Sequence, residues 1–228
     1  MLKLVDELFG NRHKGETAVI VANGPSLNKT DFSLLKDVAT FGLNKIYLGF
    51  ERFQFYPKYY VAVNEKVLRQ SVSEISSMNC VKFLSQRVPS LFENNAITHL
   101  LDTSLEKERF STSFDHGVNE GWTVTYVALQ IAYLMGFSKV ILIGLDHRFE
   151  FEGAPNQSQH MVGKDVNHFS DQYFADQDWD NPDLQRSEES FTVARTIFEG
   201  SGRVVLDATI GGGCAIFPKV SLEEALYV

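Results

Sequence analysis

Four polar side chains directly follow apolar stretches that are typical of buried β-strands: Asn23, Asn44, Asn64 and Asp146. Asparagine offers a donor and an acceptor without charge, so it can bind a base or sugar edge, or approach a phosphate without repelling it. In a parallel sheet, the carboxyl ends of the strands meet in the crevice where ligands bind. The spacing therefore predicts a nucleotide site, although Asn and Gly also favour ordinary turns.

The first of these turns reads Asn23-Gly24-Pro25-Ser26. Gly24 allows close approach of the backbone, and Ser26 places a hydroxyl near the start of the following helical turn. The Gly-Lys-Ser/Thr ending of a P-loop is absent, and no Gly-x-Gly-x-x-Gly follows the first strand. The P-loop and dinucleotide-binding classes are therefore disfavoured.

Two histidines in one long irregular segment are candidate general bases. His168 lies among polar and aromatic residues in "VNHFSDQYF" (166–174), as expected for a base held in a partly closed lid. His160 is the second candidate in the same segment. A lone loop histidine is commonly plain polar surface, so that alternative stays open for both.

Metal-binding signals are weak. Asp176 and Asp178 have the Asp-x-Asp spacing that can hold a divalent cation, but no apolar run precedes them, and a solvated acidic loop is the favoured interpretation. The two cysteines, Cys80 and Cys214, have no metal-ligand spacing and indicate a reducing compartment. No metal site is predicted.

Apolar runs bounded by turn residues alternate with helical patterns along the chain. Helices are predicted over 64–78, 123–136 and 184–200, the second of them apolar almost all round and hence central. This alternation predicts an α/β, Rossmann-like, mostly parallel sheet with helices on both faces. The predicted strands are 17–22, 39–43, 59–63, 80–84, 98–102, 139–146 and 203–208.

The 228 residues are expected to form a single domain, 1–228, with an insertion over 146–183 that forms a lid or acceptor region. The formal net charge of −8 argues against a nucleic-acid partner. No signal peptide and no apolar run of about 20 residues are found, which favours a soluble, cytoplasmic protein. Peripheral association with the inner membrane and homo-oligomerisation stay open.

Taken together, several stretches resemble a known pattern: "VIVANGPSL", "FGLNKIYL", "YYVAVNEKV" and "GWTVTYVALQIAYLMGFSKVILIGLDHRF". They resemble the bacterial sialyltransferases of glycosyltransferase family 42 and the wider 6-hydroxymethylpterin diphosphokinase-like family. The closing stretch, from "NHFSDQYF" to "FPKV", resembles bacterial members of the wider family found among surface-polysaccharide genes. The resemblance covers residues 17 to about 220.

The resemblance implies a Rossmann-like fold that binds a CMP-activated sugar as substrate, without a metal or other cofactor. It also implies a histidine in the lid as general base, for which His168 and His160 are the candidates. By the resemblance and the strand-end positions, the expected nucleotide-binding residues are Asn23, Gly24, Pro25, Ser26, Asn44, Asn64, Thr123, Thr125 and Asp146.

The expected function is therefore a glycosyltransferase that moves sialic acid or a related nonulosonic acid from a CMP donor to a surface glycan. One alternative is a pterin-type pyrophosphokinase with ATP and Mg²⁺, held by Asp146 or by Asp176 and Asp178. Against it, the Asp-Leu-Asp-Gly and His-Ala-His-Gly-Asp-Asn stretches of the archaeal pterin kinases are absent. A non-catalytic nucleotide-binding module is the other alternative.

Overall fold

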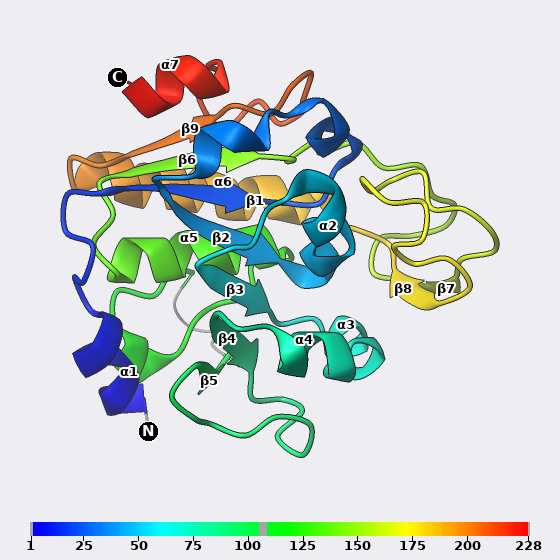
Figure 1. Cartoon of the computed structure of the whole chain (residues 1–228), viewed down its shortest axis with the longest axis horizontal. Coiled ribbons are helices and arrows are strands. Elements are labelled where there is room, and N and C mark those ends of the chain that lie inside the picture. Colours follow the sequence, from blue (N-terminus) through cyan, green and yellow to red (C-terminus); the bar gives the residue numbers. More distant parts are fainter. Residues whose placement is uncertain (1, 105–108, 228) are drawn as a thin grey trace.

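The computed structural model describes residues 2–104 and 109–227 and contains a seven-stranded sheet in the order β5-β4-β3-β2-β1-β6-β9 (Figure 1). Every neighbouring pair in this sheet is parallel. The predicted Rossmann-like α/β class is confirmed. The strands are β1 (Thr17–Val21), β2 (Ala39–Leu43), β3 (Tyr59–Ala62), β4 (Val81–Ser85), β5 (Thr98–Leu101), β6 (Lys139–Ile143) and β9 (Val204–Asp207).

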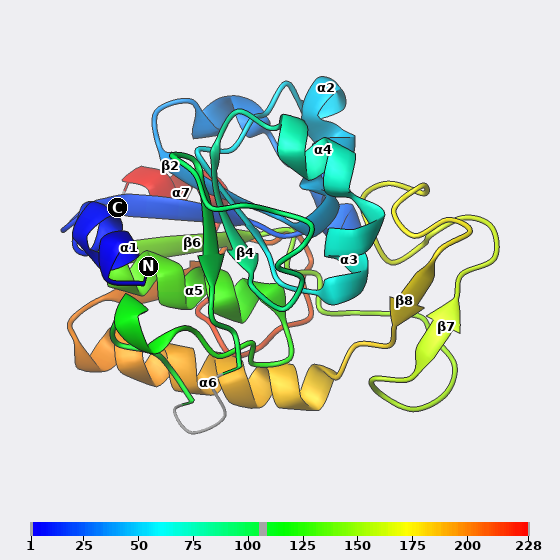
Figure 2. The ribbon, with the colours of Figure 1, turned by 90° about the horizontal axis from the view of Figure 1, so that it is seen from below.

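Helices cover both faces of the sheet, as predicted, and each face has its own apolar core. Figure 2 shows α5 and α6 below the sheet and α2 and α4 above it. The first face carries α1 (Leu2–Phe9), η4 (Phe114–His116), α5 (Val124–Leu134) and α6 (Leu184–Gly200). The second carries η1 (Pro25–Lys29), η2 (Phe32–Leu35), η3 (Asn44–Gly49), α2 (Phe50–Phe53), α3 (Glu65–Gln70), α4 (Val72–Ser77) and α7 (Leu222–Tyr227).

Helix α5 is buried almost all round because it packs on β1 to β3 and is covered by α6. Apolar residues on every side are what such a position requires, since neither face of the helix meets water. The helix places its N-terminus at the carboxyl ends of the strands, where the predicted ligand crevice lies.

The single helix predicted over 64–78 is wrong, because the chain forms two short helices that break at Ser71. Ser71 has φ −128° and ψ 27°, and its buried hydroxyl accepts a hydrogen bond from the Tyr47 hydroxyl at 2.7 Å. This contact holds the turn between α3 and α4. Tyr47 lies outside the stretch 64–78, so the sequence pattern of that stretch does not reveal the break.

The acidic stretch around Asp178 is exposed at Asp176 and Asp178, as expected, but it is not wholly a loop. Its residues form β8 (Asp178–Asp180), which pairs in antiparallel fashion with β7 (Ser158–His160). Trp179 is the reason, since its ring packs against Phe174 and is only 5% exposed. The β7–β8 ribbon lies beside the carboxyl-terminal edge of the main sheet (Figure 1).

Within the residues that the structure describes, no helix combines the length and apolar character needed to cross a membrane.

Candidate active site

Strands β2 to β5 lie on one side of β1, and β6 and β9 lie on the other side, so the strand order changes direction between β1 and β6. The loops that follow β1 and β6 are connected by hydrogen bonds. The Asp146 carboxylate accepts from the Ser26 backbone N–H at 3.0 Å and from the Ser26 hydroxyl at 2.6 Å. The Gly24 N–H donates to the Gly144 carbonyl at 2.9 Å. Of the predicted residues, Gly24, Ser26 and Asp146 therefore lie at one hydrogen-bonded junction, which we call the β1–β6 junction.

Gly24 is required at this junction by space rather than by its backbone angles. A Cβ atom on Gly24 would lie 1.9 Å from Asp146 Oδ2 and 2.7 Å from the Gly144 carbonyl oxygen. No side chain fits unless the two loops separate. The glycine thus allows Asp146 to reach Ser26.

The segment 167–174 covers this junction. The Phe169 N–H donates to the Asn23 carbonyl at 2.9 Å, and Asn28 Nδ2 donates to the Phe169 carbonyl at 3.0 Å. Asn23 is only 8% exposed, and its Oδ1 has no hydrogen-bond partner among the described residues. The open space of the site therefore lies next to this junction rather than on it.

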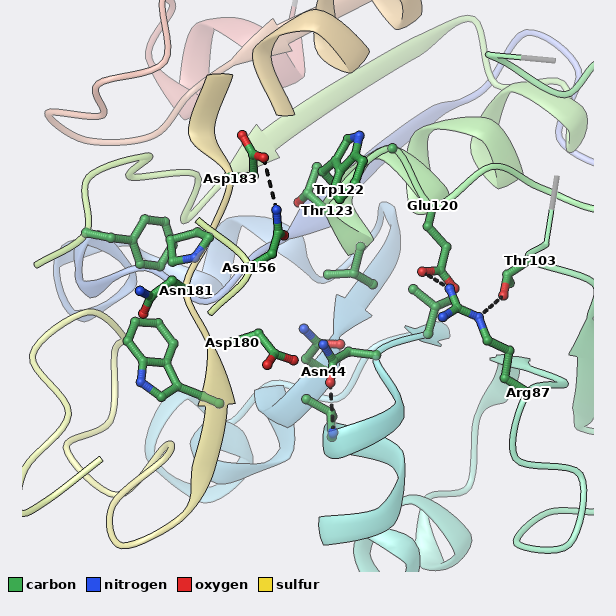
Figure 3. A pocket seen from close by; sticks show the side chains of 18 of the residues that line it. Asn44, Arg87, Thr103, Glu120, Trp122, Thr123, Asn156, Asp180, Asn181 and Asp183 are labelled. Atoms are coloured by element: carbon green, nitrogen blue, oxygen red, sulfur yellow. Dashed lines mark hydrogen bonds and ion pairs between the residues drawn. The ribbon is translucent and has the colours of Figure 1, made fainter. Parts of the chain in front are cut away.

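A cavity of about 980 Å³ lies over the carboxyl ends of β2 and β3 and the N-terminus of α5 (Figure 3). Four predicted residues line it, namely Asn44, Asn64, Thr123 and His168. The remaining lining residues are Val63, Val67, Arg87, Thr103, Ser104, Asn119, Glu120, Gly121, Trp122, Val124, Phe149, Asn156, Phe174, Trp179, Asp180, Asn181, Pro182 and Asp183.

The two asparagines after β2 and β3 lie differently in the cavity wall. Asn44 has a positive φ of 45°, its carbonyl accepts from the Tyr60 hydroxyl at 2.6 Å, and its Oδ1 has no partner in the described chain. Asn64 caps α3, because its Oδ1 accepts from the Val67 N–H at 3.1 Å. Asn44 Oδ1 is thus a buried acceptor without a partner among the described residues, while Asn64 Oδ1 is used by the helix cap.

The N-terminus of α5 faces the cavity. Thr123 caps the helix, with its hydroxyl accepting from the Thr125 N–H at 3.4 Å, and both Thr123 and Val124 line the wall. The first N–H groups of a helix and its dipole together favour an anion at this end. This part of the cavity is suited to a phosphate group.

His168 forms a pair with an aspartate that the sequence did not single out. Its Nδ1 lies 2.8 Å from Asp165 Oδ2, and the Asp165 side chain is fully buried. Because a carboxylate only accepts, Nδ1 carries the proton and Nε2 is left as the basic nitrogen. The described residues give Nε2 no hydrogen-bond partner, so it is free to take a proton in the cavity.

The loop that carries His168 is held by several contacts. The His168 ring stacks on Tyr173 with centroids 3.8 Å apart. Asn167 accepts from the Glu150 N–H at 2.6 Å and donates to the Glu150 carbonyl at 2.9 Å. The imidazole is therefore oriented before any ligand binds, which a general base requires.

Two other predicted residues lie away from the cavity lining. His160 is on the exposed β7, with Nδ1 2.8 Å from Asp178 Oδ1. Thr125 is buried within the first turn of α5 at 3% exposure. The structure thus brings His168, and not His160, into the cavity wall.

Asp165 was not predicted from the sequence, and neither were several residues of the cavity wall: Arg87, Glu120, Trp122, Asn156, Asp180, Asn181 and Asp183. The Asp-x-x-His spacing at 165–168 was the one local signal, since it suits an aspartate that supports a base. Arg87 and Glu120 form an ion pair across the cavity wall from distant parts of the chain, which no local pattern reveals. Across the described ranges, no three His, Cys, Asp or Glu side chains are grouped to hold a metal ion.

Lys45 attaches the covering segment to the end of β2. The side chain is 2% exposed, and its ammonium donates to the Tyr173 carbonyl and to Gln70 Oε1, both at 3.0 Å. Burial lowers the pKa of Lys45 to about 8, although the charges of Glu74 and Asp165 oppose the shift. The charged form is therefore less favourable in the folded protein than in the unfolded chain.

This shift predicts a pH dependence of stability. Between pH 8 and about 10.4, the unfolded lysine keeps its proton while the folded one has lost it, so stability rises with pH. We expect the free energy of unfolding of the wild type, minus that of Lys45→Met, to increase over this range. Urea unfolding of both proteins from pH 7 to 10.5 measures the difference, and a flat difference would contradict the lowered pKa.

The structure is an α/β protein with a large cavity at the carboxyl ends of a parallel sheet. The sequence model of the 6-hydroxymethylpterin diphosphokinase MptE-like family matches residues 1–152. Because this match covers more than half of the 228 residues, the chain belongs to the MptE-like family. The predicted resemblance to the 6-hydroxymethylpterin diphosphokinase-like family is thereby confirmed.

The fold is also similar to that of a solved glycosyltransferase. The structure of the MAf glycosyltransferase from Magnetospirillum magneticum AMB-1 matches with a TM-score of 0.57 and 14% sequence identity. The match covers 96% of this chain and 38% of that one, so this chain spans well under half the length of that protein. At this identity the likeness shows a shared fold. Comparison with curated protein sequences gives no significant match.

Proposed function

We propose that the protein is a glycosyltransferase that uses a CMP-activated sugar, with sialic acid or a related nonulosonic acid as the donor sugar and a glycan as the acceptor. The observation that carries the proposal is the Asp165–His168 pair in the wall of a large cavity at the carboxyl ends of a parallel sheet. The N-terminus of α5 in the same cavity supports a phosphate-bearing donor.

In the proposed reaction, His168 Nε2 removes the proton of an acceptor hydroxyl as its oxygen attacks the anomeric carbon of the donor. The bond between the anomeric carbon and the phosphate oxygen breaks, and its electron pair leaves with CMP. Asp165 holds the Nδ1 proton and stabilises the imidazolium that forms. The Val124 N–H at the start of α5 and the Thr123 hydroxyl stabilise the charge on the leaving phosphate.

We assign the nucleotide to the part of the cavity next to the β1–β6 junction. Asn44 supports this assignment, because it lines the cavity at the end of β2, the strand next to β1. Ser26 and Asp146 act as positioning residues here, since their side chains bond to each other. A single phosphate leaving group can be stabilised by backbone donors and hydroxyls alone, so we expect transfer that is independent of a metal.

The name of the family raises a second candidate, a pterin pyrophosphokinase that uses ATP and Mg²⁺. Thermal unfolding with a panel of nucleotides separates the two. We expect CMP and CTP to raise Tm, because a ligand at one hundred times its Kd stabilises the folded state by about 2.7 kcal/mol. ATP with Mg²⁺ should give no comparable shift. A shift with ATP and Mg²⁺ that EDTA abolishes, and none with CMP, would support the pyrophosphokinase instead.

A further inference from the structure

Arg87 supplies the positive charge of the cavity wall. Of the described residues that line the cavity, it alone is a lysine or an arginine. Apart from His168, the other ionisable side chains of the lining are the carboxylates of Glu120, Asp180 and Asp183. An acidic group of a ligand that enters the cavity therefore finds its permanent cationic partner in Arg87.

The Arg87 guanidinium is oriented by two segments that are distant in the sequence. Its Nη2 forms an ion pair with Glu120, in the turn before α5, and its Nε donates to Thr103 Oγ1, after β5, at 3.4 Å (Figure 3). The Arg87 backbone N–H donates to Ser85 Oγ at 3.2 Å, and Ser85 Oγ lies 2.7 Å from Thr103 Oγ1. The guanidinium is therefore held in the cavity wall before a ligand binds.

Arg87 also keeps donors for a ligand. A guanidinium carries five N–H groups, and the contacts with Thr103 and Glu120 use Nε and Nη2. Nη1 has no hydrogen-bond partner among the described residues, and the side chain is 46% exposed. Nη1 can thus donate to a carboxylate of a ligand in a charge-assisted hydrogen bond, which is stronger than a bond between neutral groups.

The pair with Glu120 leaves Arg87 available for such a contact. The Glu120 side chain is 27% exposed, so water screens the attraction between the two charges. Ion pairs at partly exposed positions contribute little to stability, and a competing carboxylate can share or replace the partner at small cost. Glu120 therefore orients Arg87 without occupying it.

The position of Glu120 connects Arg87 to the part of the cavity assigned to the phosphate. The Thr123 N–H donates to the Glu120 carbonyl at 3.1 Å, so the ion-pair partner of Arg87 and the cap of α5 belong to one turn. In a nonulosonic acid donor, the carboxylate and the phosphate oxygen are attached to the same anomeric carbon. Such a donor needs two neighbouring anion sites, and Arg87 and the N-terminus of α5 supply them.

We propose that Arg87 binds the carboxylate of the donor sugar and is a specificity-determining residue that selects an acidic donor sugar over a neutral one. Nη1 donates to the carboxylate while Nε stays on Thr103. With the phosphate at the N-terminus of α5, this contact fixes the rotation of the anomeric carbon in the cavity that His168 lines. The proposal rests on the proposed function, because it takes the site of the phosphate from it.

Isothermal titration calorimetry with the full chain tests the proposal. The two main probes are CMP, which lacks the carboxylate, and CMP-3-fluoro-N-acetylneuraminic acid, which carries it and resists transfer. Arg87→Met is measured in a Glu120→Gln background, so that the variant does not leave Glu120 as an unpaired charge. In this background, Arg87→Met should weaken binding of the fluorinated donor by about 10- to 100-fold, and binding of CMP by no more than about threefold.

Three further variants separate recognition of the carboxylate from a structural role. Arg87→Lys in the same background keeps a positive charge and should retain part of the affinity for the fluorinated donor. Glu120→Gln alone removes the competing carboxylate, so this affinity should stay unchanged or rise. Arg69→Met is the matched control and should change neither Kd, because Arg69 forms a similarly exposed pair with Glu65 on α3, outside the cavity lining. Thermal unfolding shows whether each variant is folded.

Equal weakening of both probes by Arg87→Met, or no weakening of either, overturns the proposal and leaves the proposed function standing. UDP is the third probe. Binding of UDP that depends on Arg87, without binding of the fluorinated donor, would assign Arg87 to a second phosphate and likewise overturn the proposal. If the wild type binds neither CMP nor the fluorinated donor, the proposed function is wrong and the role of Arg87 falls with it.

Discussion

Replacing His168 by alanine is expected to slow the release of CMP from CMP-sialic acid by about 10²- to 10⁴-fold, the usual contribution of a general base. Because His168 also stacks on Tyr173 and pairs with the buried Asp165, thermal unfolding of the variant checks that it is folded. Nucleotide binding should survive, since the nucleotide is assigned to other residues. CMP release and the CMP-induced rise in Tm measure the two properties separately.

The matched controls for this prediction are His160→Ala and Asp165→Asn. His160→Ala should retain activity, because His160 lies on the exposed β7 outside the cavity lining. Asp165→Asn keeps the size of the side chain but can present its amide N–H to His168 Nδ1, so it should reduce the rate and disturb its pH profile. Loss of activity in His160→Ala with full activity in His168→Ala would exclude His168 as the base.

Replacing Gly24 by alanine is expected to destabilise the protein by about 1–3 kcal/mol, the range for overpacking a filled site. The added methyl group would lie 1.9 Å from Asp146 Oδ2 and would separate the loops after β1 and β6. Ser26 would then lose its two bonds to Asp146, and the nucleotide part of the cavity would lose its support. We therefore expect weaker CMP binding together with the lower stability.

Gly200→Ala is the matched control, because a Cβ atom there meets nothing within 4 Å and the residue ends α6. Alanine in a helix is favoured over glycine, so this variant should be neutral or slightly more stable. Urea unfolding measures both variants. Equal stability of Gly24→Ala and Gly200→Ala would show that the β1–β6 junction tolerates a side chain.

Much of the fold could be predicted, because parallel strands that helices cover on both faces appear in the sequence as continuous runs of apolar residues. Val19 to Val21 and Val140 to Ile143 are examples, since every residue in each is buried. The break at Ser71 could not be predicted, because its bond to Tyr47 joins residues that are distant in the sequence. Tertiary contacts override a local helical pattern at such a position.

The part of the candidate site that lies on the sheet was also open to prediction, whereas the insertion was not. Asn44 follows from the rule that the carboxyl ends of parallel strands meet at one edge of the sheet, whereas Thr123 is expected from the family resemblance. The positions of Asn156, Asn181 and Asp183 in the cavity wall depend on the path of a long segment, which is set by distant contacts such as that of Lys45 with Tyr173. His168 could be proposed as a base from the sequence, but its place in the cavity wall depends on the path of the segment 146–183.

The most direct test of the central claim is a crystal structure of the protein soaked with CMP. We expect the nucleotide in the cavity, with its phosphate at the N-terminus of α5 near Thr123 and its nucleoside near Asn44. His168 Nε2 should then face the side of the phosphate where the sugar would be attached. A nucleotide bound elsewhere on the chain, or an empty cavity at saturating CMP, would contradict the assignment of this site to a CMP-activated sugar.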